Sequence, residues 1–352
     1  MFTGDAPYSE RMEQSAADRR RVAIVINPSK FDDLDAMKDT IAGFSLHSGW
    51  AEPEWFGTAA DDSGLAAAEQ AVASEPDLVC VMGGDGTVRV VAGVLRGTGI
   101  PYGLLPSGTG NLLARNLAIP VDSLEDALEI AFRGQNRAID VGVATFDDGE
   151  ERPFVVMGGV GLDAQIMAGT DDNLKKKVGW GAYIAAAGPN LLKRPFGVTI
   201  AVDGEEQPQT NSIMVLACNC SSVMAGIEIA TGAVLDDGQL DLVVLQPNVV
   251  AGWVGVAIDV ASRNRNGLAS LKQWAGAEFS FELDKPVLAE LDGDPVGETT
   301  TGRFGVDVGA LIVRLPVPAS ASAGLTPRTA KVKVDEPAPA SLEESAGDVE
   351  PN

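Results

Sequence analysis

Apolar and polar positions along the first third of the chain follow an alternating pattern of strands and helices. Short apolar, β-branched runs at residues 21–28, 77–82 and 100–106 predict buried strands. The alanine-rich stretch 64–74 and the stretch that ends at Arg96 have the longer pattern of helices. Strands that alternate with helices predict a parallel sheet with helices on both faces.

The pattern changes after about Asp140. Short strand-like runs separated by turn signals predict a second, β-rich domain, most simply a β-sandwich. Residues 173–192 and 249–262 interrupt these runs, and we expect helices there. The strand-like runs are FVVMGGVG, FGVTIAVDG, NSIMVLACN, QLDLVVLQP, AEFSFELD and GALIVRLP.

A length of 352 residues favours two domains. We expect a flexible arm at 1–20, an α/β nucleotide-binding domain at 21–140 and a β-sandwich at 141–317. The remainder, 318–352, is rich in Pro, Ala, Ser and Glu and predicts a disordered tail.

The net charge of −24 argues against a nucleic-acid-binding protein, because such proteins usually present a basic face. Three cysteines without a regular spacing indicate reduced, packed thiols and a cytoplasmic protein. His47 is the one histidine, which argues against a histidine-ligated zinc site and a Ser-His-Asp triad.

Membrane contact, if it occurs, is expected to be peripheral. The most apolar run begins at residue 249, contains Asp259 and falls short of the ~20 residues that span a bilayer. Residues 173–196 combine basic side chains with Trp180 and Tyr183, a composition that suits a membrane interface. The alternative is an ordinary helix packed on the sandwich.

Two glycine-rich loops each follow a predicted strand and precede a helix. In parallel sheets this edge is where ligands bind, and glycine lets backbone N–H groups approach phosphate oxygens closely. Neither loop has the Walker or the dinucleotide pattern. We expect the loops to converge on one polyphosphate through Gly83, Gly84, Asp85, Gly86 and Thr87 and through Ser107, Gly108, Thr109, Gly110 and Asn111.

The carboxylate of Asp85 refines this prediction. An acidic side chain beside phosphates requires a cation between them, and Mg²⁺ binds through one or two carboxylates plus phosphate oxygens. Asp85 therefore indicates Mg-ATP. The alternative is that Asp85 or Thr87 only caps the following helix.

These motifs resemble the diacylglycerol kinase catalytic-domain family, which includes bacterial lipid kinases and is related to sphingosine and ceramide kinases. The resemblance covers roughly residues 21–317. It is carried by GGDGT (83–87), PSGTGNLLARNL (106–117), ID-VG (139–142), GVGLDA (159–164), VLDDGQLDLVVL (234–245) and LDGDP (291–295).

The resemblance implies ATP-dependent phosphorylation of a lipid hydroxyl in a cleft between an α/β domain and a β-sandwich. It places Asn27 and Pro28 near the nucleotide and Thr58 on the adenine side. The residues after Pro28 are Ser-Lys-Phe, where the family has small residues and glycine.

LDGDP supplies the expected general base, since a positioned carboxylate can take the proton of a lipid alcohol. Asp292 matches the family's base, and Asp294 stands where the family has glutamate. Two nearby carboxylates raise each other's proton affinity. Asp85 is the alternative base, and a surface hairpin turn is the alternative interpretation of Asp-Gly.

The resemblance also implies a structural Mg²⁺ near Asp236 and Asp237. The alternative is a simple turn between strands. Asp163 is either a further active-site carboxylate or a helix cap, and we favour the cap.

The leading hypothesis is an ATP- and Mg²⁺-dependent lipid kinase that acts on diacylglycerol or a related lipid with a free hydroxyl. The alternatives are a phosphotransferase similar to NAD kinase and a catalytically silent lipid-binding protein. Edge strands of the sandwich make a homodimer possible.

Overall fold

Four parallel strands form the first part of the main sheet, in the order β2-β1-β3-β4. Their bounds in this computed structural model are β1 Val22–Ile26, β2 Glu54–Gly57, β3 Leu78–Met82 and β4 Tyr102–Leu104. β1, β3 and β4 are buried along their whole length, as the continuous apolar runs predict. The structure describes residues 19–59, 63–161, 195–224, 227–246 and 271–317.

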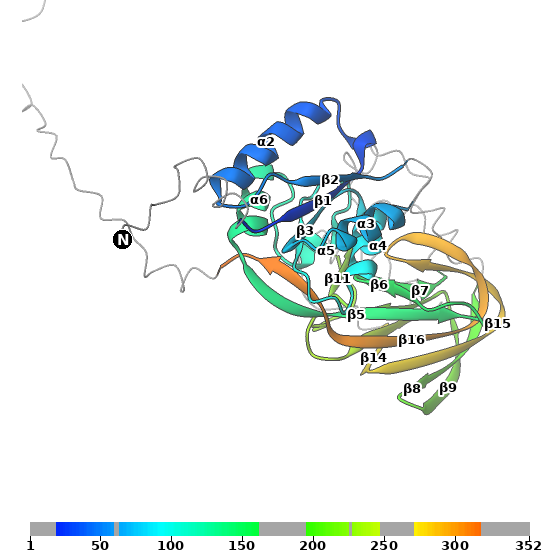
Figure 1. The fold of residues 1–352 in the computed structure, drawn as a ribbon. Helices are drawn as coiled ribbons and strands as arrows, with labels where there is room; N and C mark the ends of the chain where they lie inside the picture. The colour runs from blue at the N-terminus through cyan, green and yellow to red at the C-terminus, as the bar shows by residue number, and fades with distance from the viewer. Residues whose placement is uncertain (1–18, 60–62, 162–194, 225–226, 247–270, 318–352) are drawn as a thin grey trace, which may run out of the picture. The chain divides into compact units, whose positions relative to one another are not determined.

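Helices cover both faces of these strands (Figure 1). α2 (Leu34–His47) packs against α6 (Leu124–Arg133), and α3 (Leu65–Ala73) packs against α4 (Asp85–Leu95). A 3-10 turn, η1 (Pro28–Lys30), follows β1, and the short α5 (Leu112–Asn116) follows β4. The predicted parallel sheet with helices on both faces is therefore confirmed. The sequence analysis did not predict α2, β2 or α6.

Two long strands, β5 (Gln135–Phe146) and β16 (Asp294–Leu315), run from this first part of the sheet into the second. The last residues of β16 pair with the first residues of β5, and Val313 pairs with Tyr102 of β4 in parallel. The run GALIVRLP was predicted as a separate strand and is the end of β16. The two halves thus share one continuous 14-stranded mixed sheet within the part of the chain described.

The second half is an antiparallel, sandwich-like arrangement, as predicted. β15 (Glu278–Leu291) changes partner along its length: Phe279–Leu283 pair with β8 and Ala289–Leu291 pair with β7. A cluster of aromatic side chains that includes Phe154, Phe281 and Phe304 fills its core. The other strands are β6 Arg152–Phe154, β7 Met157–Val160, β8 Phe196–Val202, β9 Glu205–Ser212, β10 Met214–Cys218, β11 Ser222–Met224, β12 Ile227–Glu228, β13 Leu240–Leu245 and β14 Leu271–Gly276.

The described residues up to Pro316 belong to one compact unit. The domain limits expected from the sequence stay a prediction. The expected helices at 173–192 and 249–262, the basic segment with Trp180 and Tyr183, and Asp163 lie outside the described residues.

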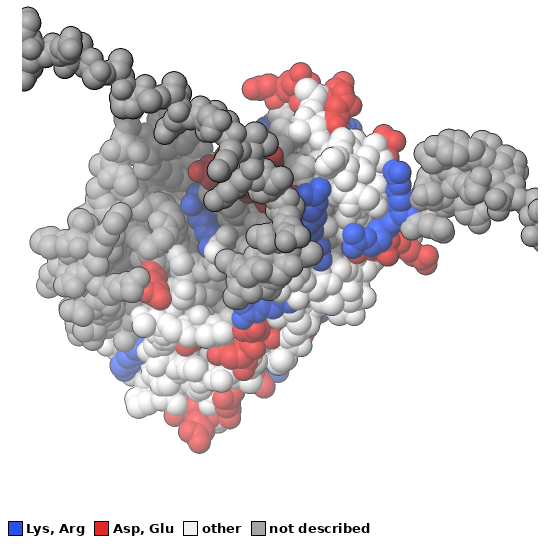
Figure 2. All heavy atoms as spheres, turned by 90° about the vertical axis from the view of Figure 1, so that its left-hand side faces the viewer, with Lys and Arg blue, Asp and Glu red and all other residues white. Residues whose placement is uncertain are grey.

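Charged side chains and cysteines are distributed differently over the described structure. On the face shown in Figure 2, acidic and basic side chains are interspersed. The three cysteines are free and buried. Among the described residues, no helix has both the length and the apolar character needed to cross a bilayer.

Candidate active site

The first glycine loop connects the carboxyl end of β3 to the start of α4. A side chain at Gly83 would place its Cβ 2.8 Å from Cβ of Thr87, so the loop can close only with glycine there. Gly84 differs, because a Cβ at this position would meet no atom within 4 Å. The first loop is thus tightly packed at Gly83 and open at Gly84.

The second glycine loop follows β4 and packs directly on the first. Asn111 closes it by accepting a hydrogen bond from the Gly108 N–H (3.0 Å) and donating one to the Gly108 carbonyl (2.8 Å). The Ser107 hydroxyl donates to the Gly83 carbonyl at 3.2 Å, and a Cβ at Gly108 would lie 3.0 Å from Cα of Gly84. The structure therefore brings together the two loops that the sequence analysis paired.

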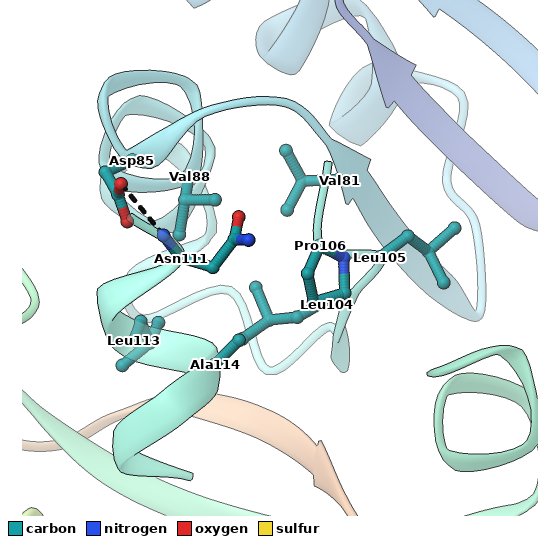
Figure 3. A pocket seen from close by; sticks show the side chains of 9 residues that line it. All are labelled: Val81, Asp85, Val88, Leu104, Leu105, Pro106, Asn111, Leu113 and Ala114. Carbon is teal, nitrogen blue, oxygen red and sulfur yellow. Dashed lines mark hydrogen bonds between the residues drawn. The ribbon is translucent and has the colours of Figure 1, made fainter. Parts of the chain in front are cut away.

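Asp85 joins the loops through its carboxylate. It accepts hydrogen bonds from the backbone N–H groups of Asn111 (3.1 Å) and Leu112 (2.7 Å), at the start of α5 (Figure 3). A side chain at Gly110 would collide with the same carboxylate. Burial raises the pKa of Asp85, and the two backbone hydrogen bonds partly offset this rise. These contacts reach the start of α5, whereas α4 has no side-chain cap, so they are not the predicted cap of the following helix. The role of Asp85 at Mg²⁺ stays a prediction.

The hollow drawn in Figure 3 lies behind this contact and is lined mainly by apolar side chains such as Val88, Leu104 and Leu113. Its volume of about 10 Å³ has room for roughly one water molecule. The hollow is therefore far too small for a nucleotide.

The nucleotide-side residues predicted from the resemblance lie at the ends of β1 and β2. Asn27 accepts hydrogen bonds from the Ser29 N–H (3.1 Å) and the Ser29 hydroxyl (2.7 Å), and Pro28 begins η1. Thr58 is 8% exposed, and its hydroxyl has no hydrogen-bond partner among the described residues. A Cβ on Gly64 would lie 3.1 Å from Cγ2 of Thr58 and 3.5 Å from Cγ2 of Thr87. Thr58 and the first glycine loop therefore lie on either side of the same point. A buried hydroxyl without a partner fits a site that completes its hydrogen bonds with a ligand.

The LDGDP motif forms the two-residue turn between β15 and β16. Asp292 (φ 50°) and Gly293 (φ 88°) both have positive φ, which is typical of a type I′ hairpin. The turn is not a surface turn, since Asp292 is only 4% exposed. Its carboxylate accepts three backbone N–H bonds, from Val155 (3.0 Å), Val156 (2.8 Å) and Met157 (2.9 Å). Burial raises the pKa of Asp292 to about 6, against the lowering effect of these bonds.

Asp294 links this turn to the first glycine loop. It forms an ion pair with Arg89 of α4 at 2.9 Å, and a Cβ on Gly86 would lie 2.7 Å from its carboxylate. The Arg89 side chain is 16% exposed, and its Nε has no hydrogen-bond partner in the described part of the chain. The sequence analysis missed Arg89, because the contact spans more than 200 residues and GGDGTVR carries no local signal for it.

The predicted metal residues of the LDDG turn (235–238) have protein partners. Asp236 forms an ion pair with Arg137 at 2.6 Å, and Asp237 accepts the Gln239 N–H at 3.0 Å. Within the described ranges, no group of three or more His, Cys, Asp or Glu side chains is arranged to hold a metal ion. The structural Mg²⁺ near Asp236 and Asp237 stays a prediction.

Asp140 explains why the LDDG turn is ordered. This side chain is 1% exposed and accepts hydrogen bonds from the N–H groups of Gly238 and Gly309, both at 2.7 Å. It therefore joins β5, the LDDG turn and β16. The ID-VG motif contains Asp140, but its scaffold role depends on partners far away in the sequence.

Comparison with known proteins agrees with this arrangement. The diacylglycerol kinase catalytic domain matches residues 22–144, and the YegS C-terminal NAD kinase beta sandwich-like domain matches residues 156–313. A crystal structure of a diacylglycerol kinase from Bacillus anthracis superposes with a TM-score of 0.67 at 20% identity, covering 86% of this chain and 99% of that one. At this identity the likeness shows the fold.

A curated relative that is matched over most of its length shows the family. A "Probable lipid kinase YegS-like" protein of Pseudomonas aeruginosa is 32% identical over 262 residues, which covers 70% of this chain and 80% of the relative. A diacylglycerol kinase of Mycobacterium tuberculosis is 32% identical over 181 residues, covering 50% of this chain and 57% of the relative. The match to the second protein thus spans little more than half its length. Together with the two domain matches, these relatives show that the chain belongs to the diacylglycerol kinase catalytic-domain family.

Proposed function

We propose that this protein is an ATP-dependent lipid kinase that transfers the γ-phosphoryl group of ATP to a free hydroxyl of diacylglycerol or a related lipid. The observation that carries the proposal is the contact between the first glycine loop and the turn at Asp292–Asp294. It brings a glycine-rich loop and a turn with a buried carboxylate to one place, from distant parts of the chain.

ATP fits the two glycine loops. A side chain at Gly108 would crowd the backbone of Gly84, and one at Gly83 would collide with Thr87 of its own loop, while Gly84 leaves open space beside the start of α4. Backbone N–H groups at the start of a helix favour phosphate through their direction and through the helix dipole. The unpartnered hydroxyl of Thr58 lies beside the same loop and supplies a further donor.

Mg²⁺ accompanies ATP in this proposal. When bound, it neutralises negative charge on the phosphate oxygens during transfer. The carboxylates available at the loop are those of Asp85 and Asp294, which lie close enough for Asp294 to raise the pKa of Asp85. Arg89 holds Asp294 at this position through their ion pair.

Asp292 is the proposed general base. Its Oδ1 accepts two backbone N–H bonds and its Oδ2 one, so Oδ2 keeps a lone pair for a substrate proton. The lipid hydroxyl gives its proton to this carboxylate while its oxygen forms a bond to the γ-phosphorus. The bond from the γ-phosphorus to the bridging oxygen breaks, and ADP leaves with that electron pair. A pKa of about 6 lets Asp292 be ionised at neutral pH and still accept a proton.

The partner and location belong to the same proposal. A lipid kinase without a described membrane helix would act at the inner face of the membrane, as a cytoplasmic and peripheral enzyme. A homodimer through edge strands also stays a proposal. The chemistry of the site does not select among lipid hydroxyls, so the acceptor has to be identified by experiment.

The test uses radiolabelled ATP, Mg²⁺ and a total lipid extract in detergent micelles, with the products separated by chromatography. The variants are Asp292→Asn and, as a matched control, Asp148→Asn, an exposed aspartate in the turn after β5. We expect a labelled lipid with the wild type and the control, and its loss with Asp292→Asn. ATP binding and thermal melting of each variant establish that the protein is folded.

Other outcomes separate the alternatives. Label on NAD instead of lipid would assign an NAD kinase-like activity. A folded, ATP-binding wild type that labels neither acceptor would contradict the kinase proposal and favour a silent lipid-binding protein. Full activity of Asp292→Asn would remove Asp292 as the base and leave Asp85 as the candidate.

A further inference from the structure

Glu290, near the end of β15, is a buried carboxyl group without a hydrogen-bond partner. The residue is 0% exposed, and neither side-chain oxygen accepts a hydrogen bond from any residue of the described structure. The residues directly across from it on the neighbouring strands are Pro295 and Gly159, which have no polar side chain. A buried, unpaired carboxylate is too costly to stay charged, so the group takes up a proton.

The charged groups around Glu290 reinforce this protonation. Burial is the largest cause of its raised pKa of about 8, followed by the negative charges of Asp292 and Asp294. The N–H of Gly293 lies close enough to lower the pKa slightly, although it makes no full hydrogen bond.

The other elements packed here do not compensate the charge. β7 carries no titratable side chain, and the thiol of Cys218 on β10 is kept neutral because burial raises its pKa. Arg89 on α4 pairs with Asp294 and lowers the pKa of Asp292, and no described cation is among the causes that shift the pKa of Glu290.

Asp292, two residues away, has the opposite surroundings. Its carboxylate accepts three backbone N–H bonds, whereas that of Glu290 accepts none. Hydrogen bonds to the charged form favour ionisation. The geometry therefore favours the charge on Asp292 and the proton on Glu290.

We propose that Glu290 is a positioning residue for phosphoryl transfer: its neutral carboxyl group leaves Asp292 as the charged member of this buried pair, ready to accept the substrate proton. The inference rests on the proposed function, because it gives Asp292 the role of base. Glu290 itself touches no reacting atom in this scheme. Loss of its proton would place a second negative charge beside Asp292 and slow the reaction at alkaline pH.

The first arm of the test measures the proton on Glu290 without any substrate. The unfolded chain loses this proton near the ordinary pKa of 4.5, whereas the folded protein keeps it to about pH 8. Stability contributed by the neutral group is therefore present at low pH and is lost as pH rises to about 8. Glu290→Gln cannot ionise. The difference in urea midpoint between Glu290→Gln and the wild type should therefore increase in favour of the variant from about pH 5 to about pH 8, and should be constant above that pH.

Glu282→Gln, at an exposed position of the same strand, is the matched control. Its difference from the wild type should be independent of pH over this range. Should Glu290→Gln fold poorly, the infrared carbonyl stretch of a protonated carboxyl group is measured in the wild type at pH 7 and in Glu290→Leu, where it should be lost. A pH-independent difference for Glu290→Gln, or no such infrared band in the wild type, overturns the inference.

The second arm measures lipid phosphorylation against pH. One pH unit above the pKa of Glu290, the wild-type rate should be about tenfold lower than its maximum rate. Glu290→Gln should keep the rate at pH 7 and lose this alkaline fall. A wild type that titrates as expected but phosphorylates no lipid refutes the proposed function and with it the positioning role. A lipid kinase whose alkaline fall is unchanged in Glu290→Gln refutes the positioning role alone.

Discussion

Two acidic turns in the second half of the chain have similar sequences and opposite surroundings. In LDDG, residues 235–238, the side chain of Asp236 is 31% exposed and forms an ion pair with Arg137. In LDGD, residues 291–294, the side chain of Asp292 is buried and accepts hydrogen bonds from three backbone N–H groups. Burial raises the pKa of Asp292. The motif alone therefore does not decide what an Asp-Gly turn does. The strands that pack on the turn decide it.

The largest effect expected from this comparison is that of Asp292→Asn on turnover. Removal of a general base typically costs 10²–10⁴-fold, so kcat should fall at least about 100-fold. The NH₂ group of asparagine cannot accept a hydrogen bond, so at least one backbone N–H that now donates to the carboxylate would lose its acceptor. The melting temperature should therefore fall. Single-turnover phosphorylation of micellar lipid, corrected for the folded fraction, measures the effect on chemistry. Asp148→Asn is the control, and a residual rate near that of the wild type would assign the turn a purely structural role.

Gly84→Ala is the next test, directed at the first glycine loop. Gly84 has φ −84° and open space around its missing side chain, so alanine fits the protein itself. A methyl group there would stand where a phosphate has to approach, and ATP affinity should fall about tenfold, equivalent to about 1.4 kcal/mol. Isothermal titration with Mg-ATP measures this change, and thermal melting should show no loss of stability.

Gly43→Ala is the matched control for the glycine test. Gly43 lies in α2, again with no atom within 4 Å of the added Cβ. It should bind ATP like the wild type and gain about 0.5–1 kcal/mol from helix propensity. If both variants bind ATP equally well, phosphate does not bind at Gly84.

Asp140→Asn tests the scaffold that holds the exposed turn. Each oxygen of Asp140 accepts one backbone N–H, so an amide would leave one buried donor unpaired. The expected cost is about 1–3 kcal/mol of unfolding free energy. Urea unfolding measures it, with Asp148→Asn as the exposed control. A change below that of the control would mean that the LDDG turn is ordered by other contacts.

The site shows how far the sequence could predict the structure. The two glycine loops were paired correctly, because the carboxyl ends of neighbouring parallel strands meet at one edge of the sheet. The contact of Arg89 with Asp294 and the burial of Glu290 were not predictable in the same way. Both depend on β15 and β16 folding back onto the first half, and no local periodicity encodes that pairing.

The sheet itself shows the same limit. Runs such as DLVCVM predicted strands because a strand buried on both faces is continuously apolar. β5 was missed because its first four residues, in Gln135–Phe146, are exposed and three of them are polar, and only pairing with β16 extends it that far. Strand length here is set by the partner strand.

The smallest effect is expected at the exposed member of the comparison, the ion pair of Asp236 with Arg137. Both side chains are partly exposed, at 31% and 50%, so solvent screens the pair and a contribution of about 0–1 kcal/mol is expected. A double-mutant cycle of Asp236→Asn and Arg137→Met, followed by urea unfolding, measures it.

The cycle should be repeated with Mg²⁺. A coupling energy well above this range without metal would show that the LDDG turn is as strongly held as the buried one. A melting temperature raised by Mg²⁺ in the wild type but not in Asp236→Asn would instead assign Asp236 to a metal site, since a ligand that binds only the folded state stabilises it.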